Sequence, residues 1–349
     1  MHLIIAHAAA HAPACRAALA ALQLPHLQRL LAQLACEHVG AGVGAGVAAA
    51  SDPADNRSPA HERALAQALG WPQADGAWPW AAWQVQRTQG QAGAQAWAWV
   101  TPCHWRMGQH SLTLEDPQTL ALDHASSAAL RTALAPWFAS AGLQLLPDAA
   151  GLPGRWLVQG ELLRDLRTTA LDCAIGRSVQ ALDLDGANAP VLRRLQSEMQ
   201  MLLYTHPIND ARVASGLQPV NSLWFSGAGA LSDAQQAQAA HGAYDAGSAP
   251  VVLDDLRASA MQGDASAWAQ TWQHIDSTHL ARLCQHLEQQ GATEPLHLTL
   301  CSLYQSRTYQ AGASAQTSAC AVQRWWARMS RPWARQPSVA EALTSLISA

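Results

Sequence analysis

The chain has 349 residues, of which 49% are hydrophobic and 13% are charged, and its formal net charge is −4. This balance excludes a chain-wide basic surface and argues against nucleic acid as a partner. All 21 basic residues are Arg, and the absence of Lys excludes a P-loop lysine, a kinase lysine and any Schiff-base mechanism.

The first predicted element is a buried strand over residues 3–6. A signal peptide is the alternative, but no Lys or Arg precedes this short apolar run. No apolar run reaches the ~18 residues that a membrane span needs. The seven Cys include no pair at Cys-x-x-Cys spacing, which argues against a disulfide framework and favours reduced thiols. We therefore expect a cytoplasmic protein with no membrane span.

Two helices are predicted next, over residues 14–22 and 27–37, from the spacing of their apolar side chains. Residues 40–51 are rich in Gly and Ala and lack periodicity, so we expect a mobile loop there. A third helix is predicted over residues 58–69, with Ser58 as its N-cap.

Residues 71–105 hold seven of the 15 Trp in a chain that has only two Phe. These side chains could form an aromatic wall for a ligand. We favour the alternative, a core that uses Trp where other proteins use Phe and Leu. Within this region residues 96–100 alternate as a strand does, and residues 112–114 predict another strand.

The later elements also alternate between helix and strand. They are helix 123–139, two short strands within 142–158, helix 189–204, strand 221–225, helix 265–289 and strand 296–303. The helix at 189–204 has the clearest apolar period, and Pro207 is expected to stop it. This alternation predicts an α/β layered fold with a mainly parallel central sheet flanked by helices.

Chemistry-bearing residues are densest where the chain reverses after the helix at 189–204. His206 can act as an acid, a base or a ligand, and Arg212 can fork onto a phosphate or a carboxylate. The candidate ligand-binding residues are His206, Asn209, Arg212, Asn221, Gly227 and Gly229. The two Gly would form a loop after a parallel strand, where backbone N–H groups can approach a ligand. The alternative is a helix stop and two tight turns in which the polar side chains cap backbone groups.

This segment also resembles a known family. It reads His206-Pro-Ile-Asn209-x-x-Arg212-x-x-x-Gly216-x-x-Pro219-x-Asn221, followed by Gly227-x-Gly229. The pattern resembles the archaeal-type cofactor-independent phosphoglycerate mutases of the alkaline-phosphatase superfamily. Residues 24–30 resemble the Pro-Asn-Leu segment that follows the first strand in that superfamily. Over nearly its full length, the chain resembles bacterial RpfE-type regulatory proteins, for example at residues 58–63 and 195–202.

The resemblance implies an alkaline-phosphatase-like fold with a Trp-rich inserted region. We expect an α/β core from residues 1–50 and 190–310, an inserted cap over 51–189 and an Arg/Trp-rich tail over 311–349. Basic and aromatic side chains alternate in this tail. Such a pattern suits contact with anionic lipid, nucleic acid or an acidic partner, but we favour a docked terminal helix.

The mutases use two metal ions and a Ser nucleophile, so the resemblance implies two divalent ions such as Mn²⁺ or Zn²⁺ in an active member. Their first strand leads into a metal-holding Asp-Gly pair, whereas here His7 follows the first strand. Asp254, Asp255 and Asp264 are the alternative metal carboxylates, but no His lies between them. A two-metal site needs several ligands converging on two centres. We therefore expect that this site is lost.

Two further histidine pairs could bind a metal. His7 and His11 could chelate if they lay on one helix. His274 and His279 are about 140° apart on an α-helix, which does not favour a shared ion.

Three functions are compatible with these patterns. The first is a phosphoglycerate-mutase-like protein without cofactor that binds a small phosphorylated ligand or acts in regulation. The second is an active metal-dependent mutase or related phosphatase. The third is a protein-interaction module that uses the C-terminal tail.

Overall fold

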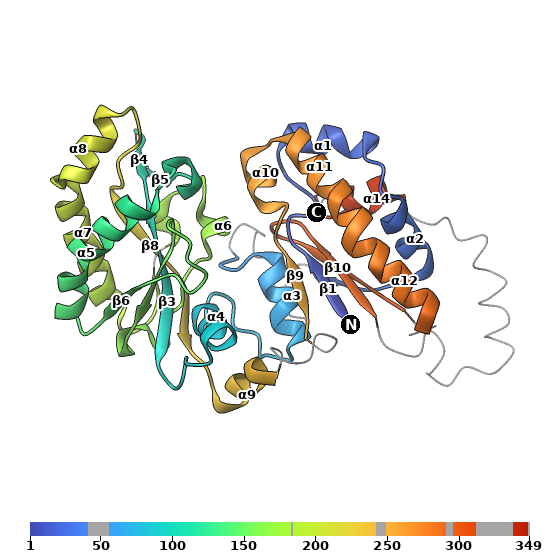
Figure 1. The fold of residues 1–349 in the computed structure, drawn as a ribbon, viewed down its shortest axis with the longest axis horizontal. Helices are drawn as coiled ribbons and strands as arrows, with labels where there is room; N and C mark the ends of the chain where they lie inside the picture. Colours follow the sequence, from blue (N-terminus) through green and yellow to red (C-terminus); the bar gives the residue numbers. More distant parts are fainter. Residues whose placement is uncertain are drawn as a thin grey trace, which may run out of the picture. The chain divides into compact units, whose positions relative to one another are not determined.

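The computed structural model describes residues 1–40, 56–109, 111–182, 184–241, 249–290, 296–311 and 338–347. The chain forms two compact units (Figure 1). Unit 1 comprises Met1–Pro53, Pro59–Gln73 and Gly247–Ala349, and unit 2 comprises Ala54–Ser58 and Ala74–Ala246. This division differs from the expected organisation, because residues 190–246 belong with the Trp-rich region rather than with the N-terminal strand.

Unit 1 is built on a mixed five-stranded sheet. Its strand order is β2 (Ala35–Gly40), β11 (Ser306–Gln310), β10 (His297–Cys301), β1 (His2–Ile5) and β9 (Val251–Leu253). Strand β1 pairs in parallel with both of its neighbours, whereas β11 is antiparallel to β10 and to β2. The α/β class and the strand after Met1 are confirmed. The short outer strands were not predicted.

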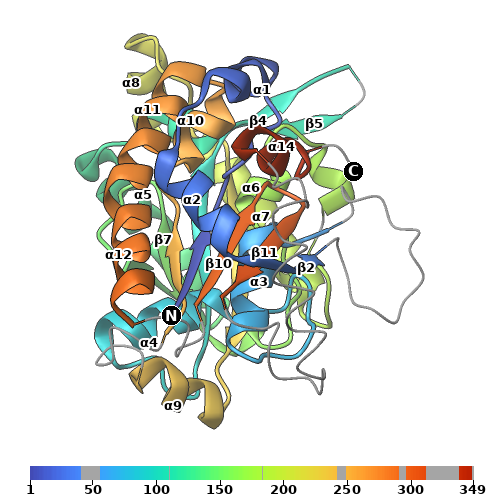
Figure 2. The ribbon, with the colours of Figure 1, turned by 90° about the vertical axis from the view of Figure 1, so that its right-hand side faces the viewer.

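Helices cover both faces of this sheet (Figure 2). Leu3 and Ile5 point into the larger core, and Ile4 points to the other face, as alternation along a strand requires. The larger core is covered by α1 (Pro13–Ala18), α2 (Pro25–Gln33), α10 (Arg257–Gln262), α11 (Ala265–Ile275), α12 (Ala281–Gln290) and α14 (Val339–Thr344). Helix α3 (Ala60–Ala68) covers the other face. It begins after Pro59, and Ser58, the predicted N-cap, belongs instead to unit 2.

The single helix predicted over 265–289 is interrupted by a π-helical segment, Asp276–Leu280. Helix α2 has no side-chain cap from its own N-terminal residue. Buried Asp276 fills that role across the core, because its carboxylate accepts the backbone N–H groups of Leu27 at 2.8 Å and His26 at 3.2 Å. The π-helical segment therefore lies where the Asp276 side chain accepts the backbone N–H groups that have no helical partner at the start of α2.

Unit 2 contains a sheet that is antiparallel throughout, which the sequence patterns did not predict. Its order is β6 (Gln144–Pro147), β7 (Trp156–Gln159), β3 (Ala96–Cys103) and β8 (Ser222–Ala230). Helices α5 (His124–Ser140) and α7 (Ala189–Tyr204) share one core with it, and α4 (Trp80–Gln89) contacts β3 and β8. Smaller elements complete the unit: the β4 (Trp105–Met107) and β5 (Leu112–Leu114) pair, α6 (Leu171–Ala174), α8 (Pro207–Ala214) and α9 (Asp233–His241).

Most of the Trp residues at 71–105 are buried in the core, as we favoured. Trp78 and Trp80 are 4% and 5% exposed, and Trp156, Trp268 and Trp272 are completely buried. With so few Phe in the chain, the large indole rings fill the space between layers. The aromatic-wall alternative is therefore not needed to explain them.

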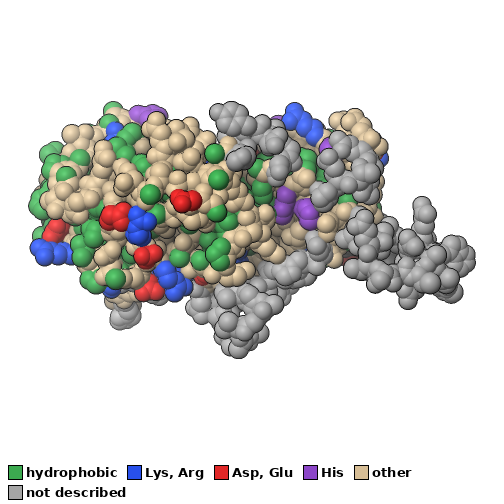
Figure 3. Space-filling model, turned by 90° about the horizontal axis from the view of Figure 1, so that it is seen from below, with side chains coloured by type: hydrophobic (Ala, Val, Ile, Leu, Met, Phe, Trp, Pro, Cys, Tyr) green, Lys and Arg blue, Asp and Glu red, His purple; other side chains and the backbone are tan. Residues whose placement is uncertain are grey.

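The surface carries few charges, and the face shown in Figure 3 has acidic and basic side chains lying next to each other. In the described segments, no helix has the length and apolar character to cross a membrane. No disulfide joins the six cysteines within them. The linker at 41–51 and the Arg/Trp tail at 323–335 lie outside the described residues.

Candidate functional site

The predicted site around His206 is the corner between α7 and α8 in unit 2. Helix α7 ends at Tyr204, and Pro207 then begins α8 rather than only ending a helix. His206 is the N-cap of α8, and its Nδ1 accepts the N–H of Ile208 at 3.2 Å. Proline at the first position of a helix lacks an N–H that would have no partner within the helix, so the His-Pro pair suits a helix start.

Asn209 is buried and bonds to backbone on both sides of the corner. Its Nδ2 donates to the carbonyl oxygens of Leu203 and Val220, both at 2.7 Å, and its Oδ1 accepts the N–H of Val220 at 2.8 Å. These three bonds fix the end of α7 to the segment that enters β8. Both donors of the amide are occupied within the protein.

Arg212 and Asn221 have similar backbone partners. The guanidinium of buried Arg212 donates to the carbonyl oxygens of Gln218 and Leu120. Burial lowers the pKa of Arg212, although nearby Asp123 favours its charged form. Asn221 accepts the N–H of Trp105 at 2.7 Å and donates to the Trp105 carbonyl at 3.0 Å. These contacts are those of the backbone-capping alternative, while ligand binding at this corner stays a prediction.

The expected glycine loop is wrong in its geometry, because Gly227 and Gly229 lie inside β8 and that strand is antiparallel to β3. Gly227 has a φ of 60°, and a Cβ there would lie 2.8 Å from the ring of Trp99. Glycine is required at position 227 because β8 passes close to the Trp99 indole, at a bulge in its pairing with β3. No phosphate-cradling loop follows a parallel strand at this point.

The alternative metal carboxylates are not gathered into one group. Asp254 and Asp255 follow β9 and are exposed, and Asp264 caps α11 by accepting the N–H of Ala267 at 3.0 Å. Among the described residues, no three His, Cys, Asp or Glu side chains are placed to hold a metal ion. This part of the chain therefore does not fit the two-ion site that the mutase resemblance implies.

A different set of polar side chains meets at the carboxyl edge of the parallel strands in unit 1. Ligands of α/β folds bind at this edge because loops from several parallel strands converge there. His7 follows β1, is only 3% exposed and has a φ of 53°, which is rare for a residue other than Gly. Strained backbone of this kind is often found at functional sites.

Two indoles hold the loop after β1 in place. Trp268 donates its N–H to the His7 carbonyl at 3.2 Å, and Trp272 donates to the Ala8 carbonyl at 3.1 Å. On the strand side, the N–H of Ala6 donates to the Leu253 carbonyl at 2.9 Å. The loop is therefore fixed from both the helix layer and the sheet before any ligand arrives.

Helix α3 brings a second histidine to this edge. The N–H of Ala60 donates to the Leu303 carbonyl at 2.9 Å, which fixes the start of α3 against the loop after β10. His61, in the first turn, then lies with its ring centroid 5.7 Å from that of His7. The guanidinium of Arg63 donates to the carbonyl of Tyr304 in the same loop.

The cluster is completed by His11, whose ring centroid is 5.6 Å from that of Tyr304. Burial lowers the pKa of His11, and the nearby charges of Arg16 and His7 lower it further. We call His7, His11, His61 and Tyr304 the edge cluster. It offers imidazole and phenol donors beside a helix N-terminus, where the backbone dipole favours negative charge.

His7 and His11 were considered as a pair on one helix, but they lie on the loop after β1. The sequence does not single out His61 and Tyr304, because the packing of α3 on the sheet brings His61 to the loop and the pairing of β10 with β1 brings the segment that holds Tyr304. The usable signal was the position of His7 directly after the first strand.

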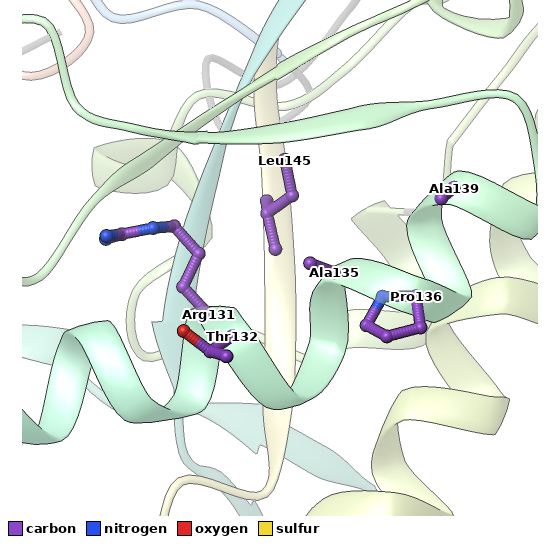
Figure 4. Close-up of a pocket in the computed structure, with 6 residues that line it drawn as sticks. All are labelled: Arg131, Thr132, Ala135, Pro136, Ala139 and Leu145. Carbon is purple, nitrogen blue, oxygen red and sulfur yellow. The ribbon is translucent and has the colours of Figure 1, made fainter.

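Unit 2 also has an open surface pocket of about 450 Å³, lined by Arg131, Thr132, Ala135, Pro136, Ala139 and Leu145 (Figure 4). Pro136 lies inside α5 and cannot donate a helical hydrogen bond. Arg131 is its single charged lining residue. Polar groups do not converge in this pocket as they do in the edge cluster.

Comparison with known proteins gives distant structural similarity alone. No protein-family model matches the chain, and no curated protein matches it. The chain is similar to the cofactor-independent phosphoglycerate mutase from Thermoplasma acidophilum DSM 1728, with 11% identity, a TM-score of 0.34 and coverage of 90% of each chain. It is also similar to the PH0037 protein from Pyrococcus horikoshii, with 12% identity, a TM-score of 0.46 and coverage of 90% of this chain and 88% of that one.

Proposed function

We propose that this protein binds a small phosphorylated ligand at the carboxyl edge of the unit 1 sheet. The observation that carries the proposal is the edge cluster, in which the fold gathers three His and one Tyr around a strained and rigidly held loop. The phosphorylated class of ligand is suggested by the sequence resemblance to phosphoglycerate mutases.

The chemistry of the cluster suits phosphate oxygens. Imidazole N–H groups and a phenol can donate hydrogen bonds, and Arg63 adds a permanent positive charge. A phosphate group has several acceptor oxygens and carries negative charge, so it can accept from donors that approach from different elements. The fixed loop after β1 lowers the entropy cost of arranging them.

Binding without phosphoryl transfer is favoured by the residues that follow the strands. The family that the sequence resembles holds metal with acidic residues after its first strand and with Asp-His after its last strand. Here His7 follows β1 and Ser302 follows β10. The finer proposal is a mutase-like protein that has lost the two-metal site and acts in regulation, as the RpfE-type resemblance suggests.

Calorimetric titration of the full chain with 3-phosphoglycerate and with inorganic phosphate tests the proposal. We expect saturable binding that His61→Gln weakens by about tenfold, roughly 1.4 kcal/mol. His274→Gln is the matched control, because His274 is an exposed residue of α11 in the same unit.

The same preparation is assayed for mutase turnover with added Mn²⁺ and for bound metal. Turnover together with about two metal ions per chain would establish the active-enzyme alternative. Absence of saturable binding to either phosphate compound would overturn the binding proposal itself.

A further inference from the structure

The opposite, amino edge of the unit 1 sheet carries a second histidine pair. His2 of β1 and His297 of β10 are direct partners in the parallel register, so their side chains extend from the same face of the sheet. Their ring centroids are 5.2 Å apart, and the ring planes are tilted by 35°. Both residues are partly exposed.

This spacing is the one that a shared metal ion requires. A metal–nitrogen bond of about 2.1 Å places an imidazole centroid about 3.2 Å from the ion, so two imidazoles at a tetrahedral angle have centroids about 5.2 Å apart. The observed separation of 5.2 Å matches this value. The two strands therefore hold the ring centroids at a separation that a shared ion allows.

Two threonine hydroxyl groups orient the ring of His2. Nε2 of His2 lies 2.8 Å from Oγ1 of Thr299, which is completely buried, and Thr299 Oγ1 lies 2.9 Å from Oγ1 of Thr308 on β11. When Nε2 donates to Thr299, the lone pair is on Nδ1. Metal-binding histidines commonly have such an oxygen partner on the second nitrogen, which fixes the tautomer and the ring orientation.

We propose that His2 and His297 form a two-histidine site for a divalent transition-metal cation of the Zn²⁺, Ni²⁺ and Cu²⁺ group. Imidazole is a preferred ligand for these ions, and Cu²⁺ binds most tightly among them. With two protein ligands, water completes the coordination sphere, as in open rather than structural sites. Strand β1 begins toward the lower side of unit 1 in Figure 1.

The test is titration of the full chain with Cu²⁺ alone, followed by calorimetry and by electron paramagnetic resonance. We expect one site that is tighter than any other, with hyperfine coupling to two imidazole nitrogens. His2→Gln and His297→Gln should each weaken that site at least about tenfold, and the double variant should abolish it. His274→Gln should leave it unchanged.

Zn²⁺ provides a second readout. Because the ion joins β1 to β10 in the folded state, Zn²⁺ should raise the melting temperature of the wild type but not that of His2→Gln. Circular dichroism of the metal-free variants checks that they fold. If the tightest Cu²⁺ site persists in the double variant, or if the spectrum shows one imidazole or none, the proposal is wrong.

Discussion

The α7–α8 corner of unit 2 and the carboxyl edge of unit 1 use polar side chains in opposite ways. The corner has a dense local motif, but Asn209, Arg212 and Asn221 all bond to nearby backbone. The carboxyl edge draws side chains from distant parts of the chain. The ring of His61 lies beside that of His7 on a strained loop, and the ring of Tyr304 lies beside that of His11. The first arrangement stabilises a chain reversal, and the second brings donors from separate elements to one edge of the sheet.

The difference shows why motif density alone is an uncertain guide to a site. A reversal between a helix and a strand exposes backbone groups that need partners, so Asn, Arg and His collect there for structural reasons. Four effects are expected, from the largest to the smallest, and the first and the last of them test this comparison directly.

Asn209→Ala should destabilise the protein by about 4 kcal/mol, because it removes the partners of one buried N–H and two buried carbonyls. Urea unfolding measures the loss, and Ser215→Ala, an exposed change at the end of α8, should stay within about 0.5 kcal/mol of wild type. Phosphate affinity of folded Asn209→Ala should be unchanged. If the folded variant lost phosphate affinity, the ligand site would lie at the α7–α8 corner.

Acid should destabilise unit 1 through His2. Burial, then His297 and the N-terminal amine, lower the pKa of His2 from 6.5 to about 4. The unfolded chain therefore binds this proton more readily, and stability is lost as pH falls from about 6.5 to about 4, by roughly 3 kcal/mol at most. Unfolding free energies of His2→Gln should depend less on pH over this window, whereas a slope equal to that of wild type would show that His2 is not the group responsible.

Gly227→Ala should cost about 2 kcal/mol, because alanine is strained at a φ of 60° and its Cβ would lie 2.8 Å from the Trp99 ring. Gly154→Ala is the matched control, since an added Cβ there meets no atom within 4 Å. Thermal unfolding compares the melting temperatures of the two variants, and that of Gly227→Ala should be lower. Equal melting temperatures would mean that β8 does not pass in close contact with Trp99.

The local parts of the fold could be predicted from the sequence. The helix at 189–204 and the strands on either side of the turn at 147–154 follow from periodicity and turn residues, which act over a few positions. Local patterns do not predict the full length of strand β8 or the start of α8, because Gly227, Gly229 and Pro207 usually interrupt regular structure. Their roles depend on Trp99 packing beside β8 and on Pro207 following an N-cap.

The edge cluster could be predicted only in part. His7 was noted because it follows the first strand, but His61 is 54 positions away and reaches it through the packing of α3 on β1 and β10. That contact is set by the small and apolar face of α3, with Ala60 and Ala64 against Ile4 and Cys301. Pairings of this kind depend on tertiary packing, which periodicity along one segment does not report.

The smallest change, and the most direct test of the central claim, is the response of individual imidazoles to ligand. In a chain labelled with ¹⁵N-histidine, NMR titration with 3-phosphoglycerate should shift the resonances of His7, His11 and His61 and leave His206 unmoved, with assignments from His61→Gln and His206→Gln. If His206 shifts while the edge cluster stays unchanged, the ligand binds at the α7–α8 corner and the proposed site at the carboxyl edge of unit 1 is wrong.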